Sequence, residues 1–184
     1  RTASRMRPLE ELGVRVMESP QAVAQAADVL ILGVKPYQAV EVLEQMRPGL
    51  TAEKTVVSVA AGVSCQRLSQ AVDGRCPVVR CMPNTPSLIG QGMSGLYAAP
   101  GATAADRELT DALLHPTGKL LWVKEEAQLD AVTAISGSGP AYVFYWIEAL
   151  MQGGVELGLS EAESRELAAQ TLAGQHPVVV LHRF

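Results

Sequence analysis

The first hundred residues alternate short apolar runs with stretches of helical spacing, and turn residues separate them. Residues 28–34 form a nearly unbroken apolar run, which is the pattern of a strand buried on both faces of a sheet. Residues 55–60 and 77–81 predict further buried strands, and residues 14–17 predict a short strand after a helix that Gly13 closes. This alternation predicts an α/β fold with a doubly wound, mostly parallel sheet.

A second group of elements follows in the sequence. It comprises a strand over residues 92–99, a helix over 103–114 and a strand over 120–123. Residues 127–157 are then rich in helix formers, which predicts two long helices that meet at a glycine-rich joint. Ser160 and Glu163 have the spacing of a capping box, so a third helix is expected to begin there. We therefore expect an α/β domain over residues 1–125 and a helical domain over residues 126–184.

Composition and charge exclude several classes of protein. The chain has 184 residues, 48% of them apolar and 18% charged, which fits a soluble globular protein with a genuine core. A net charge of -4 and the lack of a basic stripe give little attraction for nucleic acid. No apolar stretch reaches the roughly 20 residues needed to cross a bilayer, and no apolar signal segment opens the sequence. We expect a cytoplasmic protein without a membrane partner.

The cysteines and histidines do not suggest a metal site. Cys65, Cys76 and Cys81 are odd in number and form no CxxC motif, so three reduced cysteines are expected. The three histidines are spread along the sequence and form no cluster with the cysteines. Since zinc needs three or four clustered ligands, no metal is expected.

Two turns after predicted strands are candidates for ligand binding. The first is Gly33-Val34-Lys35-Pro36 and the second is Val59-Ala60-Ala61-Gly62. Ligands of open parallel sheets bind outside the carboxyl ends of the strands, where Lys35 would place a cation near phosphates. The small side chains of the second turn would let a ring or a ribose approach the backbone. A plain turn with a solvated lysine and tight packing of helix on sheet are the alternatives.

A third turn, residues 81–86, follows the next predicted strand and reads Cys-Met-Pro-Asn-Thr-Pro. Two prolines and an Asn-Thr pair are an unusual way to build a plain turn. Asn84 and Thr85 would add donors and acceptors at the carboxyl edge of the sheet. We expect a functional role for Asn84, and a purely structural turn is the alternative.

The segment Ser136-Gly-Ser138-Gly-Pro140 interrupts a helical stretch. Each glycine weakens a helix by roughly 1 kcal/mol relative to alanine, so another requirement should keep the glycines there. Two explanations stay open: a kink where backbones pack closely, or a helix N-terminus whose free amides and hydroxyls face an anionic ligand. The aromatic residues that follow, Tyr142, Phe144 and Trp146, are predicted to be packing residues of the next helix.

Arg1 and Thr2 would lie just after the second strand of a nucleotide-binding fold. An arginine and a hydroxyl at that place suit the 2′-phosphate of NADP, whereas an acidic residue favours NAD. A solvated terminus is the alternative interpretation.

Taken in order, these motifs resemble those of the pyrroline-5-carboxylate reductase family. The segments that carry the resemblance are Arg1-Thr2, residues 33–36, 59–62, 80–86, 92–97 and 130–142. The likeness extends over residues 1–172. It implies a Rossmann-like domain followed by an all-helical dimerisation domain.

The resemblance also implies a reaction and its site. Members of the family reduce pyrroline-5-carboxylate to L-proline with NADPH or NADH, and they assemble as homo-oligomers. The implied cofactor contacts are Arg1, Thr2, Val34, Lys35, Pro36, Val59, Ala60, Ala61 and Asn84. Ser136 and Ser138 are implied as catalytic residues beside the nicotinamide and the substrate, with Ser138 holding either the substrate or the cofactor carboxamide.

Departures from the family pattern lie at both ends. No G-x-G-x-x-G turn precedes Arg1, so the first βα unit is expected to be missing. The family's Ser-Pro-Gly-Gly-Thr-Thr loop, which grips the substrate carboxylate, is also not found, so the helical domain is expected to be truncated. The chain is therefore expected to be a fragment of a reductase. A non-catalytic fragment that acts only through subunit association is the alternative. A reductase of hydroxy acids is a third interpretation, but such enzymes carry a catalytic lysine in the helical domain and no lysine follows Lys124.

Overall fold

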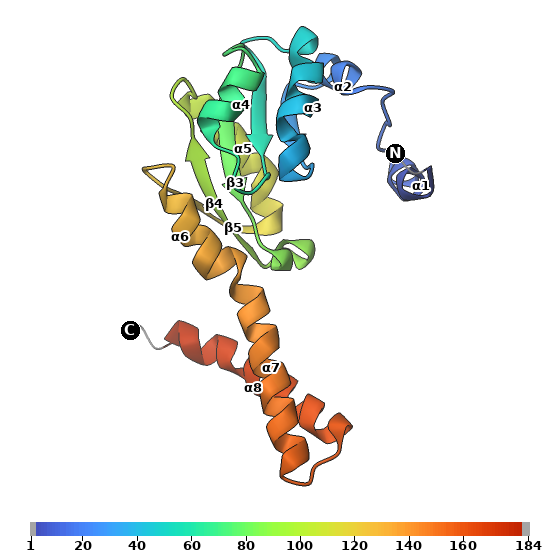
Figure 1. The fold of residues 1–184 in the computed structure, drawn as a ribbon, viewed down its shortest axis with the longest axis vertical. Coiled ribbons are helices and arrows are strands. Elements are labelled where there is room, and N and C mark those ends of the chain that lie inside the picture. Colours follow the sequence, from blue (N-terminus) through green and yellow to red (C-terminus); the bar gives the residue numbers. More distant parts are fainter. Residues whose placement is uncertain (1–2, 182–184) are drawn as a thin grey trace.

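A five-stranded sheet in the order β1-β2-β3-β4-β5 forms the centre of the computed structural model, which describes residues 3–181 (Figure 1). The strands are β1 Val29–Leu32, β2 Thr55–Ser58, β3 Val78–Met82, β4 Gly92–Ala98 and β5 Gly118–Trp122. The first three strands run parallel, β4 is antiparallel to β3, and β5 is parallel to β4. The mostly parallel sheet expected from the sequence is confirmed.

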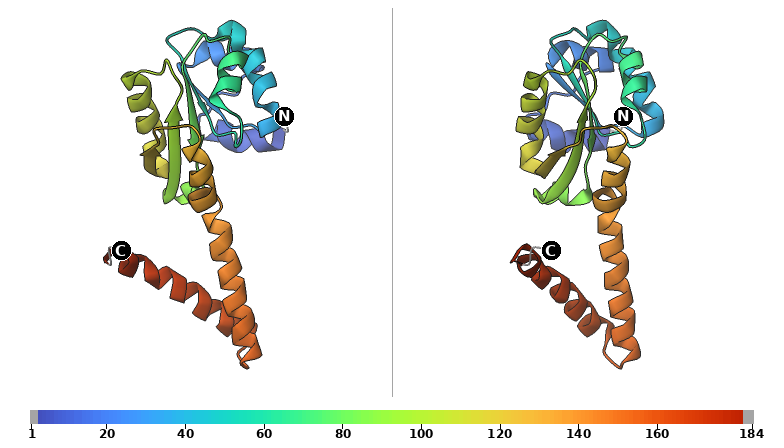
Figure 2. Two further views of the ribbon diagram at one scale, coloured as in Figure 1. Left: turned by 60° about the vertical axis from the view of Figure 1, so that its left-hand side comes forward. Right: turned by 90° about the vertical axis from the view of Figure 1, so that its left-hand side faces the viewer.

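Helices cover both faces of this sheet (Figure 2). They are α2 Pro20–Ala26, α3 Ala39–Met46 and α4 Cys65–Ala71 on one face, and α5 Ala104–Leu114 on the other. The core of the first face includes Leu30, Leu43, Val56, Leu68 and Val78. The core of the second face includes Val57, Val79, Cys81, Leu96 and Leu114. Neighbouring residues of each strand therefore point to different cores, as the two-residue period of a strand requires.

The helical part begins with α6 Gln128–Val132 and a π-helix over Thr133–Gly137, and then continues into α7 Gly139–Glu156 and α8 Glu161–Leu181. Helix α7 runs away from the sheet and α8 turns back at an angle, so the two form an open V (Figures 1 and 2). The capping box that begins α8 is confirmed: Ser160 N–H donates to Glu163 Oε2 at 2.8 Å, and Glu163 N–H donates to Ser160 Oγ at 3.3 Å. The first of the two helices expected to be long is short, because α6 passes into the π-helix after one turn.

Two strand predictions are wrong. Residues 14–17 form no strand, because no neighbouring strand pairs with them in the described part of the chain; they extend between α1 (Ala3–Glu11) and α2. Burial on both faces is also wrong for β1. Leu30 and Leu32 are buried, but Ile31 is 52% exposed on the other face. The described helices cover this edge strand on one face only.

The aromatic residues of α7 are also placed differently from the prediction. Tyr142, Phe144 and Trp146 are 60%, 61% and 51% exposed. Their assignment as packing residues is wrong within this chain, since no described helix or strand covers this stretch of α7. The sequence pattern identified an apolar surface but not what covers it.

Candidate functional site

The turns that follow β1, β2 and β3 lie along one edge of the sheet. The register pairs Leu32 with Ser58 and Ser58 with Arg80, so the three parallel strands end side by side. Val59 N–H donates to the Leu32 carbonyl oxygen at 3.2 Å and continues the ladder into the turn. The structure therefore brings the predicted cofactor residues of these turns to a common edge. They are Val34, Lys35, Pro36, Val59, Ala60, Ala61 and Asn84. Arg1 and Thr2 lie outside the described residues.

The space above the first two turns is open. A methyl group added at Gly33 or Gly62 would meet no atom within 4 Å. Lys35 is exposed, and its ammonium group makes no hydrogen bond or ion pair with the described residues. Ala60 is buried and its N–H donates to Ser58 Oγ at 3.3 Å, which fixes the second turn from within. The edge thus offers small residues and one unpaired cation to a ligand.

The amide of Asn84 connects the sheet to the helical part. Its Oδ1 accepts from Met93 N–H at 2.9 Å, and its Nδ2 donates to the Ser136 carbonyl oxygen at 3.0 Å. These two bonds orient the amide and show that Asn84 has at least a structural role. Contact between Asn84 and a cofactor stays a prediction.

The serine-glycine segment combines a π-helix with the start of α7. Ser138 N–H donates to the Thr133 carbonyl oxygen at 2.8 Å, and Pro140 occupies the first turn of α7. A methyl group at Gly137 would lie 2.7 Å from Met82 Cε, so the glycine allows close packing against the end of β3. This geometry fits the kink explanation. Because α7 also begins here, it does not remove the explanation based on a helix N-terminus.

The two predicted catalytic serines have different surroundings. The Ser136 hydroxyl donates to the Val132 carbonyl oxygen at 3.0 Å. The Ser138 hydroxyl has no hydrogen-bond partner among the described residues, and it does not cap α7. Ser138 is therefore the serine whose hydroxyl is available to a ligand.

A groove of about 620 Å³ joins the third turn to this segment. Its lining consists of Asn84, Thr85, Pro86, Leu88, Ile89, Ser136, Gly139, Pro140, Val143 and Phe144. Apolar side chains form most of the wall, and few polar groups line it. Leu88 and Ile89 are 91% and 76% exposed, so the wall is open to solvent on their side.

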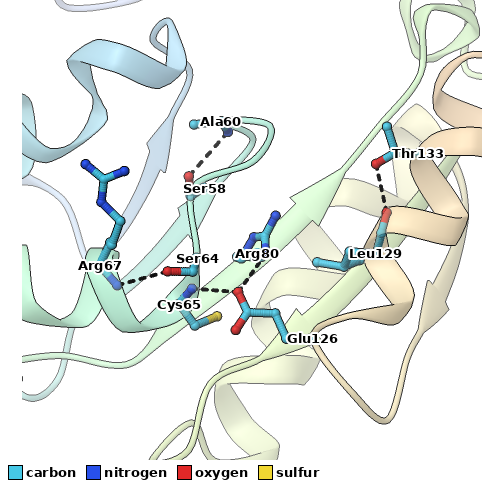
Figure 3. A network of polar contacts seen from close by, with 9 residues as sticks. All are labelled: Ser58, Ala60, Ser64, Cys65, Arg67, Arg80, Glu126, Leu129 and Thr133. Atoms are coloured by element: carbon cyan, nitrogen blue, oxygen red, sulfur yellow. Dashed lines mark hydrogen bonds and ion pairs between the residues drawn. The ribbon is translucent and has the colours of Figure 1, made fainter.

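A polar network fastens the start of the helical part to the sheet (Figure 3). Glu126 Oε1 accepts from Arg80 Nη1 at 2.6 Å and from Cys65 N–H at 2.7 Å. Desolvation would raise the pKa of Glu126, but these hydrogen bonds and the charge of Arg80 outweigh it and hold that pKa below its ordinary value. Burial and the Glu126 carboxylate raise the pKa of the Cys65 thiol to about 12.

Sequence reasoning missed this network, although Arg80 was part of a motif. An arginine within an otherwise apolar strand is a usable signal, because a nearly buried guanidinium needs a counter-charge. The sequence does not tell which of the 19 carboxylates provides it.

A glycine spacing typical of dinucleotide sites occurs elsewhere. Residues 90–95 read Gly-Gln-Gly-Met-Ser-Gly, but they enter β4 instead of linking a strand to a helix. A methyl group at Gly92 would lie 2.7 Å from the Thr117 carbonyl oxygen, and one at Gly95 would lie 2.6 Å from Val132 Cγ1. These glycines permit close packing, and they do not form a phosphate-binding turn between a strand and a helix.

The described residues offer neither a metal site nor a membrane-spanning helix. Among residues 6–174, whose side chains the structure describes, no three His, Cys, Asp or Glu side chains gather closely enough to hold a metal ion. All three cysteines are free and buried. None of the described helices is long and apolar enough to span a bilayer.

Known relatives match nearly the whole chain. A pyrroline-5-carboxylate reductase of Pseudomonas aeruginosa is 45% identical over 164 residues, which cover 89% of this chain and 60% of the relative. The solved reductase of Coxiella burnetii superimposes with a TM-score of 0.87 at 32% identity and covers 95% of this chain and 65% of its own. The Plasmodium falciparum enzyme, solved with NADP bound, gives 0.84 at 32% identity, covering 91% of this chain and 63% of its own. The chain thus spans less than two thirds of the length of these relatives.

The sheet, its open carboxyl edge and the attached helices have the architecture of an α/β NAD(P)-binding domain followed by a helical domain. Residues 1–62 match the family described as NADP oxidoreductase, coenzyme F420-dependent, and residues 126–182 match pyrroline-5-carboxylate reductase dimerisation. The chain belongs to the pyrroline-5-carboxylate reductase family.

Proposed function

We propose that this chain functions in the reduction of 1-pyrroline-5-carboxylate to L-proline, with NADPH or NADH as reductant. The observation that supports the proposal is a row of three features along the carboxyl edge of the sheet. These are the open strand ends with Lys35, the amide of Asn84 and the available hydroxyl of Ser138. The relatives from Pseudomonas aeruginosa and Haemophilus influenzae are named pyrroline-5-carboxylate reductase.

The residues at the edge fit the nicotinamide and ribose part of the cofactor. One side of the cofactor would be lined by Val34, Lys35 and Pro36. The other side would be lined by Val59, Ala60 and Ala61, where open space lies above small side chains. Asn84 would bound the site at the third strand. Arg1 and Thr2 are proposed near the adenosine phosphate. When bound, the reduced nicotinamide supplies the hydride.

The reaction needs little catalytic apparatus from the protein. A cyclic imine is protonated easily, and the resulting iminium carbon accepts hydride, so positioning that carbon provides much of the rate. Ser138 would donate a hydrogen bond to the substrate or to the cofactor carboxamide. Ser136 would act through its backbone, because its carbonyl oxygen accepts from Asn84 and fixes the segment beside the third turn. Its hydroxyl already donates to the Val132 carbonyl oxygen.

We also propose that the protein acts as a homo-oligomer in the cytoplasm. The exposed aromatic residues of α7 form an apolar surface of the kind that a subunit interface covers. The part that carries them matches a dimerisation family, and we place the domain boundary near Glu125. Three free, buried cysteines suit a reducing compartment. The same surface supports a second candidate function, in which the chain acts only through association with another subunit.

The test is NADPH oxidation with 1-pyrroline-5-carboxylate by this chain and by a chimera. In the chimera, this chain replaces the matched region of the Pseudomonas aeruginosa relative. Activity of the chimera supports reduction as the function, and an inactive chain beside it favours the association role for the 184 residues alone. A folded chimera that binds NADPH but does not oxidise it with this imine would contradict the proposal.

A further inference from the structure

One short segment on the sheet holds Ser136 and leads directly into Ser138, the two predicted catalytic serines. We call residues 126–137 the docking segment; it consists of Glu126, Ala127, α6 and the π-helix. At its start, Glu126 binds Arg80 and the Cys65 N–H (Figure 3). At its end, the Ser136 carbonyl oxygen accepts from Asn84. The segment is therefore held at both ends by polar bonds to the α/β part.

The middle of the docking segment packs closely on the sheet. Leu129 is 1% exposed, and Val132 lies so near β4 that a methyl group at Gly95 would be 2.6 Å from its Cγ1. The Thr133 hydroxyl donates to the Leu129 carbonyl oxygen at 2.7 Å and joins α6 to the π-helix. The segment is thus a single short helical rod that packs on the sheet between its two polar attachments.

Glu126 is the group that this attachment most depends on. One of its oxygens accepts both bonds, and the side chains of Arg80 and Glu126 are only 12% and 29% exposed. Without the carboxylate, a nearly buried guanidinium has no counter-charge and the first amide of α4 has no acceptor. Loss of one partner of such a pair costs more than the pair contributes, because the remaining charge is left desolvated.

We propose that Glu126 is a positioning residue, which docks the segment on β3 and so places Ser136 and Ser138 at the cofactor edge. In this role Glu126 acts through the segment that it holds and not by contact with substrate or cofactor. This role rests on the proposed reduction, but the docking itself is measurable without it. A displacement of about 1 Å at a reacting group can lower a rate about 100-fold, so loosening one end of a short rod is sufficient to affect the chemistry.

Three variants separate the parts of the proposal. Glu126→Ala removes both bonds, whereas Glu126→Gln removes the charge and keeps an oxygen for the Cys65 N–H. Glu125→Gln is the matched control, because the neighbouring Glu125 is exposed and its side chain makes no bond within the described residues. Each variant is compared with the parent chain.

The first readout is the rate constant at which a thiol reagent modifies the thiolate of each cysteine, taken from the pH dependence of modification, because loss of the Glu126 carboxylate also lowers the pKa of the Cys65 thiol. Cys65 is 4% exposed beside Glu126, while Cys76 and Cys81 are buried elsewhere and serve as internal controls. We expect Glu126→Ala to speed modification of Cys65 at least tenfold, with Cys76, Cys81 and the Glu125→Gln protein unchanged. Equal acceleration at all three would mean that Glu126→Ala unfolds the chain, and Glu126→Gln then decides, with selective acceleration at Cys65 supporting docking.

The second readout is hydrogen exchange at the far end of the segment. The N–H groups of Ser138 and Met93 are expected to exchange faster in the Glu126 variants, since the first closes the π-helix and the second bonds to Asn84. In the chimera, kcat is expected to fall about 10-fold to 100-fold with a smaller change in KM. Unchanged exchange and Cys65 modification in both variants would overturn the positioning role. An inactive parent chimera would instead overturn the proposed reduction and leave the docking result standing.

Discussion

Replacement of Gly95 by alanine is expected to destabilise the chain through one contact. A methyl group there would lie 2.6 Å from Val132 Cγ1, 2.9 Å from its Cγ2 and 3.1 Å from its Cβ. Both residues are held in place. Gly95 pairs with Met82 of β3 and Leu121 of β5. Val132 is part of α6 in the docking segment. Overpacking of a well-packed core typically costs about 1–3 kcal/mol. At about 2–4 °C per kcal/mol for a protein of this size, Tm should fall by roughly 2–12 °C.

The assay is thermal and urea unfolding of four proteins. Gly95→Ala is measured beside the parent, Val132→Ala and the double variant, so that the coupling energy isolates the contact. Gly95→Ala should cost much less stability in the Val132→Ala protein than in the parent, because the methyl groups that it meets are then absent. Gly153→Ala is the control, since nothing lies within 4 Å of a methyl group there and helical alanine is favoured over glycine by about 1 kcal/mol. Equal stability of Gly95→Ala and the parent, or purely additive effects, would refute the close packing of α6 on β4.

Three further predictions follow from the site. In an active chimera, Ser138→Ala should lower kcat/KM about tenfold, which corresponds to the loss of one hydrogen bond. Ser136→Ala should change kcat/KM little, because that hydroxyl already donates to the Val132 carbonyl oxygen. Equal effects of the two variants would contradict the assignment. Asn84→Ala should lower the free energy of unfolding by about 1–3 kcal/mol in urea, since it leaves the Met93 N–H without an acceptor; an unchanged urea midpoint would show that the bridge contributes nothing. Because the folded-state pKa of Glu126 is depressed, its contribution to stability is present above the ordinary carboxyl pKa and is lost as pH falls through the folded-state value. Glu126→Gln should therefore flatten the acid limb of stability against pH, and Glu125→Gln should leave it as in the parent.

Local sequence patterns predicted the elements whose formation depends on nearby residues. The buried strands β2 and β3 follow from short apolar runs, and the start of α8 follows from the Ser160 and Glu163 capping box. The third turn was recognised as unusual from its prolines and Asn84. Parallel strands end at one edge of a sheet, so the meeting of the candidate turns there followed from their order in the sequence.

Features that depend on distant partners were not predictable in the same way. The Arg80 and Glu126 pair joins residues 46 positions apart, and only the packing of α6 brings them together. The strand predicted at residues 14–17 had a suitable local pattern, but it has no neighbouring strand to pair with among the described residues. The aromatic residues of α7 show the same limit, because an apolar helical face identifies a contact surface and not its partner.

The most direct test of the central claim follows the hydride itself. The chimera is supplied with 1-pyrroline-5-carboxylate and NADPH deuterated on the transferred position of the nicotinamide, and the product is analysed by mass spectrometry. The account predicts L-proline that carries one deuterium on the ring carbon formerly double-bonded to nitrogen, in an amount equal to the NADPH oxidised. NADPH oxidation without labelled proline, or no turnover by a chimera that is folded and binds NADPH, would contradict it.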